Sequence, residues 1–524
     1  MSDGANRPQG VSPDPCELEI LVTASEAYPR LEALFLAAHD RVDMGFRLFD
    51  PRTKLRSDAA RAIGDTWADL FLHTLNRGVS IDLTLSDFDP VMAHEMHEQA
   101  WHFVAMLTAL NEMSAPDAAR IKARCILHPA KGGIVPRLMF AGRTRKELMR
   151  IVRNINDSPD PERRFRFTPG LQDLLVFEGG RVRARPRALP RLYPVTLHHK
   201  MAVFDGSTTY IGGLDLNERR VDDAAHDQPA QDTWHDTQVV SQDPSLAKDA
   251  CAFLKALPQV INREGQLPKP VSAFRTTLSR RRASDTLSLA PENVSDSLLD
   301  AHLTQIGKAQ EFIYLETQYF RDRRIVSALV AAGKRNKNLR IVVLVPAAPE
   351  SVAFSDRPGL DARFGEYLQA RGMRRLHACF GDRFLAVSPV QPRQPDRRDT
   401  SAERATLAGA PIIYVHSKVS IFDRDTAIVS SANLNGRSMK WDAEAGLVIT
   451  RKAQVEALSQ KIFRYWLAQE ADGPPKKVFA QWTQRALQNA SLPPSERHGF
   501  IVPYDMKPNR QAGTALPGAP EEMV

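Results

Sequence analysis

Two stretches of the sequence share one pattern. Leu197–Asn217 reads LHHKMAVFDGSTTYIGGLDLN, and Val415–Asn435 reads VHSKVSIFDRDTAIVSSANLN. Both spell His-x-Lys-x4-Asp, continue with an apolar run and a turn of small residues, and end in Leu-Asn; they align without a gap. A single short pattern arises easily by chance, but two copies in register indicate an internal duplication. The motif residues are His198, Lys200 and Asp205 in the first copy and His416, Lys418 and Asp423 in the second.

The histidine and lysine of each motif are two residues apart, and the apolar run around them predicts a strand. Alternate side chains of a strand point to one face, so His198 shares a face with Lys200, and His416 with Lys418. Two such strands side by side would surround one point with two imidazoles and two ammonium groups. This set suits a phosphodiester, because lysines neutralise the non-bridging oxygens while one histidine attacks and the other protonates the leaving alcohol. Lysines supply the positive charge, so the sequence predicts no metal and no cofactor.

The paired motifs resemble those of the phospholipase D superfamily. Tyr314–Phe320, YLETQYF, resembles the IENQYF-type strand of its eukaryotic-like phospholipases, and the similarity extends from about Val42 to Glu444. The resemblance implies that His198 is the nucleophile and forms a phosphohistidine. It also implies that His416 acts first as a general acid and then as the base that activates water.

The resemblance further implies one orienting carboxylate some tens of residues after each motif histidine. The matching positions are Asp236, in Trp-His-Asp, and Glu444, in Trp-Asp-Ala-Glu, with Asp442 as the competitor for the second role. The motif aspartates Asp205 and Asp423 complete the catalytic motifs, and we expect them to brace the motif turns rather than to touch substrate.

The small-residue turns differ between the two copies. In the second copy, Ser431 and Asn433 resemble phosphate hydrogen-bond donors of the family. The first copy has Gly213 and Asp215 at the matching positions, so the resemblance does not extend to a phosphate contact by Asp215.

The overall composition is that of an ordinary globular protein with a basic balance. The 524 residues are 43% hydrophobic and 25% charged, with a formal net charge of +8. This balance favours an anionic partner, either a phospholipid surface or nucleic acid. The four cysteines are far apart, with no C-x-x-C, so neither a disulfide framework nor a zinc site is predicted.

No apolar run is long enough for a transmembrane helix, and the polar N-terminus lacks the apolar core of a secretory signal. We therefore expect a cytoplasmic protein, a peripheral membrane protein or one that is exported by a leaderless route.

Predicted helices and strands follow the same order before each motif. This order predicts an α/β fold of two similar α-β-α sandwich domains, related by internal duplication, with the active site at their interface. The expected domains cover residues 18–266 and 272–502, joined by a Pro-rich linker, with an insertion at about 113–191 in the first. The tails, residues 1–17 and 503–524, are expected to be disordered.

Two stretches suggest how substrate approaches. Arg181, Arg183, Arg185 and Arg187 are spaced two apart, so on a strand they would make one cationic face. This face is either a solvated edge or a patch that attracts anionic headgroups. The Pro- and Arg-rich loop at 389–409 is either a lid or a loop without such a role.

The leading functional prediction is a phosphodiesterase of the phospholipase D type. It would hydrolyse a glycerophospholipid at a membrane surface to phosphatidic acid and a headgroup alcohol, with transfer to another alcohol as a second outcome. The alternatives are a phosphatidyltransferase similar to cardiolipin or phosphatidylserine synthases, a nuclease of the same superfamily, and a non-catalytic membrane-binding scaffold. One chain carries both motifs, so a monomer is expected to hold a whole site and nucleic acid is the less favoured substrate.

Overall fold

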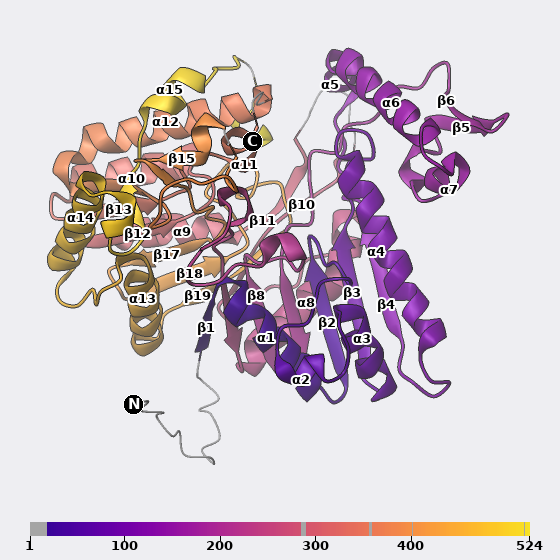
Figure 1. The fold of residues 1–524 in the computed structure, drawn as a ribbon, viewed down its shortest axis with the longest axis horizontal. Coiled ribbons are helices and arrows are strands. Elements are labelled where there is room, and N and C mark those ends of the chain that lie inside the picture. The colour runs from indigo at the N-terminus through magenta and orange to yellow at the C-terminus, as the bar shows by residue number, and fades with distance from the viewer. Residues whose placement is uncertain (1–17, 284–289, 356–358, 401, 518) are drawn as a thin grey trace.

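The computed structural model describes residues 18–283, 290–355, 359–400, 402–517 and 519–524 (Figure 1). The N-terminal tail predicted for residues 1–17 lies outside this part of the chain. Two mixed sheets form the framework. The first has the strand order β1 (Leu18–Val22), β9 (Thr237–Ser241), β8 (Thr208–Gly212), β7 (Met201–Phe204), β2 (Arg41–Phe46), β3 (Ser80–Ser86) and β4 (Ile121–Ile126).

The second sheet repeats this topology. Its order is β11 (Glu292–Asp296), β10 (Phe274–Arg280), β19 (Glu444–Ile449), β18 (Thr426–Ser430), β17 (Val419–Phe422), β12 (Phe312–Glu316), β13 (Arg340–Leu344), β14 (Phe384–Pro389) and β20 (Ile501–Pro503). In each sheet three neighbouring strands are parallel, β2–β4 and β12–β14, and the motif strand joins them antiparallel. Apart from the edge strands β11 and β20, the two orders match strand for strand. The predicted α/β duplication is therefore confirmed.

Helices cover both faces of each sheet. The outer face of the first sheet is covered by α1 (Thr23–Ala37), α3 (Trp67–Asn76) and α4 (His94–Met113), with the short α2 (Asp58–Arg61) beside α1. The outer face of the second is covered by α9 (Ser297–Lys308), α10 (Arg323–Arg335) and α12 (Leu360–Phe380). The other faces of the two sheets share one core. There α8 (Pro244–Ile261) packs on the first sheet and on β10, α13 (Lys452–Leu467) packs on β1 and β18, and α14 (Pro475–Ser491) packs on β12, β13 and β20.

The motif strands show why the two halves pack together. In β7, Met201 and Val203 point into the core between the sheets, whereas Ala202 and Phe204 point into the outer core under α1 and α3. This alternation is the two-residue period of a strand that is buried on both faces. This core takes side chains from both sheets and from α8, α13 and α14. The two motif strands are consequently fixed relative to each other by one continuous apolar core.

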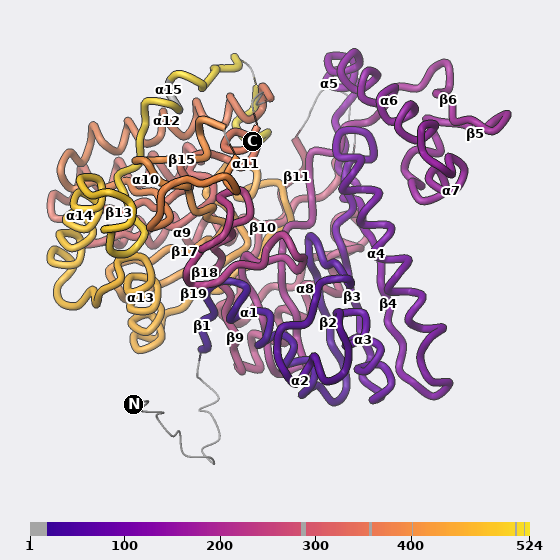
Figure 2. Tube along the Cα trace, viewed as in Figure 1, coloured from indigo at the N-terminus to yellow at the C-terminus, as the bar shows by residue number. Residues whose placement is uncertain are grey.

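An additional segment projects from the first half (Figures 1 and 2). Between β4 and β7 the chain forms α5 (Ile134–Met139), α6 (Ala141–Asn156), α7 (Pro161–Arg166) and the hairpin β5 (Leu175–Glu178)–β6 (Arg181–Ala184). This segment has a small core of its own, in which Leu148 and Ile151 of α6 pack with Leu175 and Val182 of the hairpin. The matching stretch of the second half, between β14 and β17, holds in its described residues the two-residue strands β15 (Thr406–Leu407) and β16 (Ala410–Pro411) and a single 3-10 turn.

The loop at 389–409 is attached to the first half of the chain. Within it, Arg393 pairs with Asp399 at 2.7 Å, and the Asp399 carboxylate accepts a hydrogen bond from the backbone N–H of Ala230 at 2.9 Å. Its role as a lid stays a prediction.

Three sequence expectations need correction. Strand β7 begins at Met201 and β17 at Val419, so the motif histidines and lysines lie just before the strands rather than in them. The described part of the expected C-terminal disordered tail contains α15 (Lys507–Ala512) and a 3-10 turn at Glu521–Met523. The expected arginine strand is shorter than predicted, because β6 contains Arg181 and Arg183 but ends at Ala184, before Arg185 and Arg187.

Among the described residues, the helices are all too short or too polar to cross a membrane.

Candidate active site

The two motifs meet where the halves join. Leu197, just before the first motif histidine, forms a bridge with Ala443 of the second half, and Val415 forms the equivalent bridge with His235 of the first. The backbone N–H of His198 donates to the Ala443 carbonyl at 2.8 Å, and that of His416 donates to the His235 carbonyl at 2.8 Å. Each motif histidine is therefore anchored through its own backbone to the opposite half.

The histidine side chains are held by carboxylates in the same crossed manner. His198 Nδ1 lies 3.0 Å from Glu444 Oε2, and His416 Nδ1 lies 2.6 Å from Asp236 Oδ2. The two imidazole centroids are 6.5 Å apart. Because each Nδ1 faces a carboxylate, the Nε2 atoms are the ones left for a substrate. The structure thus brings together the four residues that the sequence pointed to, in pairs that each combine both halves.

Burial strongly affects the titration of this group. It lowers the pKa of both His198 and His416 well below the ordinary value, and the neighbouring Lys200 and Lys418 add to the effect. Burial also raises the pKa of Asp236 to about 6 and that of Glu444 to about 8. The physical cause is the same in each case: little water remains to solvate a charge, so the neutral form is favoured.

Each motif lysine is hydrogen-bonded to the backbone carbonyl of its motif histidine. Lys200 Nζ donates to the backbone carbonyl of His198 at 2.6 Å and lies 3.7 Å from Asp215 Oδ2, and Lys418 donates to the carbonyl of His416. Both side chains are almost wholly buried. Burial lowers the pKa of Lys418 to about 7.

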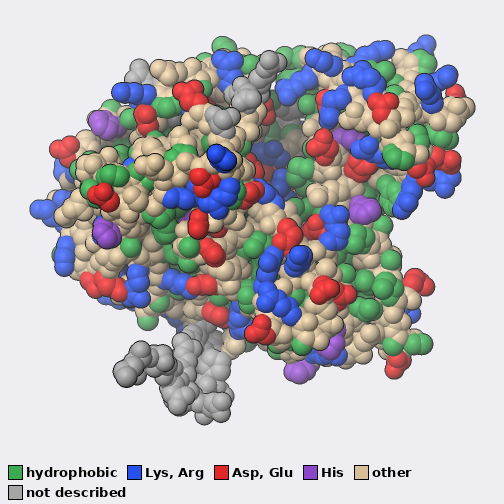
Figure 3. Space-filling model, viewed as in Figure 1, with side chains coloured by type: hydrophobic (Ala, Val, Ile, Leu, Met, Phe, Trp, Pro, Cys, Tyr) green, Lys and Arg blue, Asp and Glu red, His purple; other side chains and the backbone are tan. Residues whose placement is uncertain are grey.

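A cleft of about 430 Å³ opens above the two histidines. Figure 3 shows it as a hollow between the two halves, with Lys and Arg side chains visible inside. Four arginines from separate stretches of the chain line it: Arg47, Arg220, Arg321 and Arg437. Arg437 is held by Asp442, whose Oδ2 lies 3.0 Å from Arg437 Nε. Asp442, the competitor for the orienting role, therefore positions an arginine of the cleft, while Glu444 contacts the histidine.

Comparisons with known proteins identify one superfamily. The model of a family described as "Cardiolipin synthase, PLD-like domain" matches residues 302–466. "Phospholipase D alpha 1" of Carica papaya is 24% identical over 354 residues, 47% of this chain and 44% of that protein. "Phospholipase D2" of Bos taurus is 28% identical over 220 residues, 37% of this chain and 22% of that protein. The chain belongs to the phospholipase D superfamily.

The fold agrees as well. The crystal structure of phosphatidylserine synthase from Haemophilus influenzae Rd KW20 has a TM-score of 0.50 and 14% identity, and the match covers 90% of this chain and 93% of that one. At this identity the likeness concerns the fold alone. The chain aligns with less than half the length of the curated phospholipases D, "Phospholipase D alpha 2" of Brassica oleracea var. capitata being matched over 23% of its length.

The two motif aspartates of the superfamily, Asp205 and Asp423, lie in the turns after the motif strands. Asp205 accepts hydrogen bonds from the backbone N–H groups of residues 39–41, at 2.9, 2.9 and 3.0 Å. Asp423 accepts from those of residues 310–312, at 2.7, 2.8 and 2.8 Å. Both have a positive φ, 50° and 51°, which Asp tolerates better than most residues. They brace the start of β2 and β12, and neither lines the cleft.

The small-residue turns explain one difference between the copies. The Oγ of Ser431 donates to Glu444, so its hydrogen is used on the carboxylate rather than aimed at a phosphate. At the matching Gly213 a Cβ would lie 2.2 Å from Asp236 Oδ1, so glycine is needed for Asp236 to reach His416. Asn433 does line the cleft, and its Nδ2 donates to Gln318 Oε1 at 3.2 Å. Asp215 accepts from Leu48 N–H and faces Lys200 instead of the cleft.

Two residues that hold the candidate active site in place, Glu316 and Trp234, were missed by the sequence analysis. Glu316, inside the YLETQYF stretch, is fully buried, lies 3.0 Å from His235 Nε2 and accepts from Ser417 Oγ, so it fixes the chain on both sides of the His416 bridge. The Trp234 ring lies 4.6 Å from that of His416, and the Arg220 guanidinium lies 3.5 Å from the Trp234 centroid. The sequence did contain a signal for Glu316, because a glutamate within an apolar strand needs a buried partner.

The C-terminal residues also reach the cleft. Met523 and Val524 line it, and Glu522 pairs with Lys440 at 3.3 Å. The sequence offered no apolar periodicity from which this contact could be predicted.

Proposed function

We propose that this protein is a phospholipase D that hydrolyses the distal phosphodiester of glycerophospholipids through a phosphohistidine on His198. The observation that supports it is the crossed pair of imidazoles, 6.5 Å apart between centroids, at the floor of an arginine-lined cleft. Two rings at this separation can stand on opposite sides of one phosphorus atom. This arrangement suits an in-line displacement with one nucleophile and one acid.

The first half-reaction breaks the bond between phosphorus and the headgroup oxygen. His198 Nε2 attacks phosphorus with its lone pair while its Nδ1–H remains on Glu444. His416 Nε2 gives its proton to the departing headgroup oxygen, and Asp236 stabilises the imidazolium before this transfer. The products are a free headgroup alcohol and a phosphatidyl group bound to His198. The roles of the two histidines are those that the family resemblance implies.

The second half-reaction restores the enzyme. His416, now neutral, takes a proton from water; the water oxygen attacks phosphorus, and the bond from His198 Nε2 to phosphorus breaks. Phosphatidic acid leaves. In both steps the cleft arginines face the charge that develops on the phosphoryl oxygens. Lys200 and Lys418, buried next to the two histidines and bonded to their backbone carbonyls, add positive charge that water screens little.

A phosphatidyltransferase is the second candidate. It is favoured by the family model that matches residues 302–466, which is described as a cardiolipin synthase domain. In this case the hydroxyl of a second lipid or alcohol, rather than water, would attack the phosphohistidine. Both candidates share the first half-reaction, so the difference lies in which hydroxyl reaches His198.

The deciding experiment incubates the protein with mixed phospholipid vesicles, chelator and ethanol, followed by mass spectrometry of the lipids. We expect phosphatidic acid together with phosphatidylethanol, and no product from His198→Ala. A matched control is His102→Ala, because that histidine is exposed on α4 and outside the cleft. Cardiolipin or exchanged headgroups in place of phosphatidic acid would move the assignment to a transferase. Product from His198→Ala at the normal rate would refute the proposed nucleophile.

A further inference from the structure

Helix α5 exposes an unusual set of apolar side chains. Ile134, Val135, Leu138 and Met139 are 56, 43, 59 and 76% exposed, although the helix has only six residues. Of the large apolar side chains that are exposed in the described chain, no other group lies so close together in sequence. A patch of this kind marks a surface that contacts an apolar partner.

Basic side chains follow directly on α6. Arg143, Arg145 and Lys146 are exposed, and within the described residues none of them has an acidic partner in a salt bridge. Figure 3 shows blue side chains gathered over this upper end of the first half, where Figure 1 places α5 and α6. Exposed apolar residues beside uncompensated positive charge fit an anionic membrane surface better than an apolar protein groove, because the charges would stay at the headgroups.

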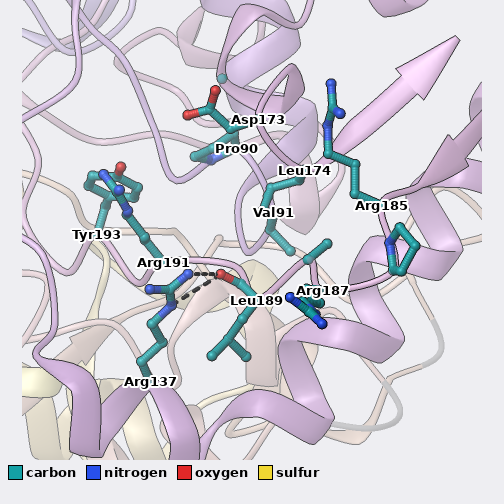
Figure 4. A pocket seen from close by; sticks show the side chains of 13 residues that line it. Pro90, Val91, Arg137, Asp173, Leu174, Arg185, Arg187, Leu189, Arg191 and Tyr193 are labelled. Atoms are coloured by element: carbon teal, nitrogen blue, oxygen red, sulfur yellow. Dashed lines mark hydrogen bonds between the residues drawn. The ribbon is translucent and has the colours of Figure 1, made fainter.

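A cavity of about 670 Å³ adjoins this helix. Four arginines line it, Arg137 of α5 and Arg185, Arg187 and Arg191 of the segment after β6, against a single carboxylate, Asp173. Figure 4 shows these side chains around one space. Arg137 is fixed there, because its guanidinium donates to the backbone carbonyls of Leu189 and Pro190. The apolar part of the lining includes Val91, Leu174 and Leu189.

The cavity lies close to the catalytic cleft along the chain. Tyr193 lines the cavity and Thr196 lines the cleft. Three residues span at most ~11 Å even when fully extended. The link is held in place, since the backbone N–H of Tyr193 donates to Asp89 and that of Thr196 donates to Asp442, at 2.9 and 2.8 Å. A membrane that contacted α5 would therefore lie within reach of the cleft mouth.

We propose that α5 and the arginine-lined cavity form a docking surface for an anionic phospholipid bilayer, with the α5 side chains among the acyl chains and one lipid phosphate in the cavity. This lipid is bound, not cleaved, because the cavity contains neither motif histidine. The inference deepens the proposed function and rests on it in one respect, namely that the substrate is presented by the same membrane.

Vesicle binding tests the proposal in the full-length protein. Wild type is sedimented with phosphatidylcholine vesicles that contain or lack about a third of phosphatidylglycerol. The apolar variant is Leu138→Ser with Met139→Ser, and the charge variant is Arg185→Gln with Arg187→Gln. Their matched controls are Met113→Ser with Leu487→Ser, apolar residues that are 65 and 59% exposed elsewhere, and Arg374→Gln with Arg375→Gln, exposed arginines of α12.

We expect each test variant to lose about tenfold or more of its affinity for the anionic vesicles, since each removes two side chains that contact the bilayer, either basic groups at the headgroups or apolar groups among the acyl chains. The controls should bind like wild type. Equal binding by test and control variants would overturn the proposal, as would equal binding of wild type to neutral vesicles. Complete displacement by millimolar inorganic phosphate would also overturn it, because the cavity would then take a soluble anion.

Failure of the proposed function can be told apart from failure of this inference. All variants are assayed on a short-chain phosphatidylcholine below its micelle concentration, where no surface exists, and their rates should equal that of wild type. His198→Ala should bind vesicles normally and turn over nothing. If wild type does not cleave the soluble substrate but the binding differences persist, the docking surface stands and the catalytic assignment falls.

Discussion

Replacing Glu444 with glutamine should stabilise the protein, and by an amount that depends on pH. Burial raises the pKa of this carboxyl from 4.5 to about 8. The folded protein therefore holds a proton that the unfolded chain has released, so raising the pH through this window favours unfolding. A shift of that size corresponds to ~5 kcal/mol, at 1.36 kcal/mol per pKa unit. This stability is present below pH 4.5 and is fully lost above about pH 8.

Glutamine has nearly the same shape but does not ionise, so Glu444→Gln avoids this loss. We expect the variant to unfold at nearly the same temperature as wild type at pH 5, and several degrees higher at pH 8.5, as measured by calorimetry across the pH range. Glu311→Gln is the matched control, because that side chain is exposed. Parallel pH curves for wild type and Glu444→Gln would refute the reasoning. The same variant should lose activity, since an amide, unlike the carboxyl, cannot ionise to stabilise the positive charge that develops on the His198 ring.

Three further predictions concern the rest of the site. Gly213→Ala should fold but lose about 100-fold in kcat, because the new Cβ would displace Asp236 by its close contact with Oδ1; normal kcat would contradict the crossed geometry. Asp423→Ala should lower the free energy of unfolding by ~2 kcal/mol in denaturant titration, because three hydrogen bonds from backbone N–H groups are lost. The folded variant should keep its kcat within threefold of wild type. A larger loss of kcat would assign Asp423 a direct catalytic role. The kcat/KM of wild type should fall as the pH rises through about 7, where Lys418 loses its charge. Lys418→Arg should move this fall to higher pH. An unchanged pH profile would mean that the charge of Lys418 does not determine the fall in kcat/KM.

The parts of the fold that follow local patterns could be predicted from the sequence. The two motifs, the apolar strands and the repeated order of elements all depend on residues near one another in the chain. The boundaries were less accurate. Strands β7 and β17 begin only after Lys200 and Lys418, because the chain just ahead of these lysines, at Leu197 and Val415, bridges to the other half. Which carboxylate meets which histidine depends on partners 180 and 246 residues apart, and no local pattern reports it.

The cleft arginines were missed for a related reason. Arg47, Arg220, Arg321 and Arg437 come from four separate stretches, and each by itself resembles a surface arginine. Two charge pairs, Glu521 with Arg371 and Glu522 with Lys440, hold the C-terminal segment whose Met523 and Val524 line the cleft. Composition alone could not distinguish this segment from a solvated tail. The Ser431 hydroxyl was assigned to phosphate because its bond to Glu444 exists only after folding.

The crossed pairing bears on how such a site can lose its symmetry. If the two halves were separate, identical subunits, every substitution would appear in both histidine environments at once. In one fused chain the environments are free to diverge, and here they have: aspartate faces one ring and glutamate the other, with Gly213 behind the first and Ser431 behind the second. Burial raises the pKa of Asp236 to about 6 and that of Glu444 to about 8, so the two carboxyls no longer behave alike. Fusion thus allows two equivalent histidines to specialise, one to attack and the other to carry a proton.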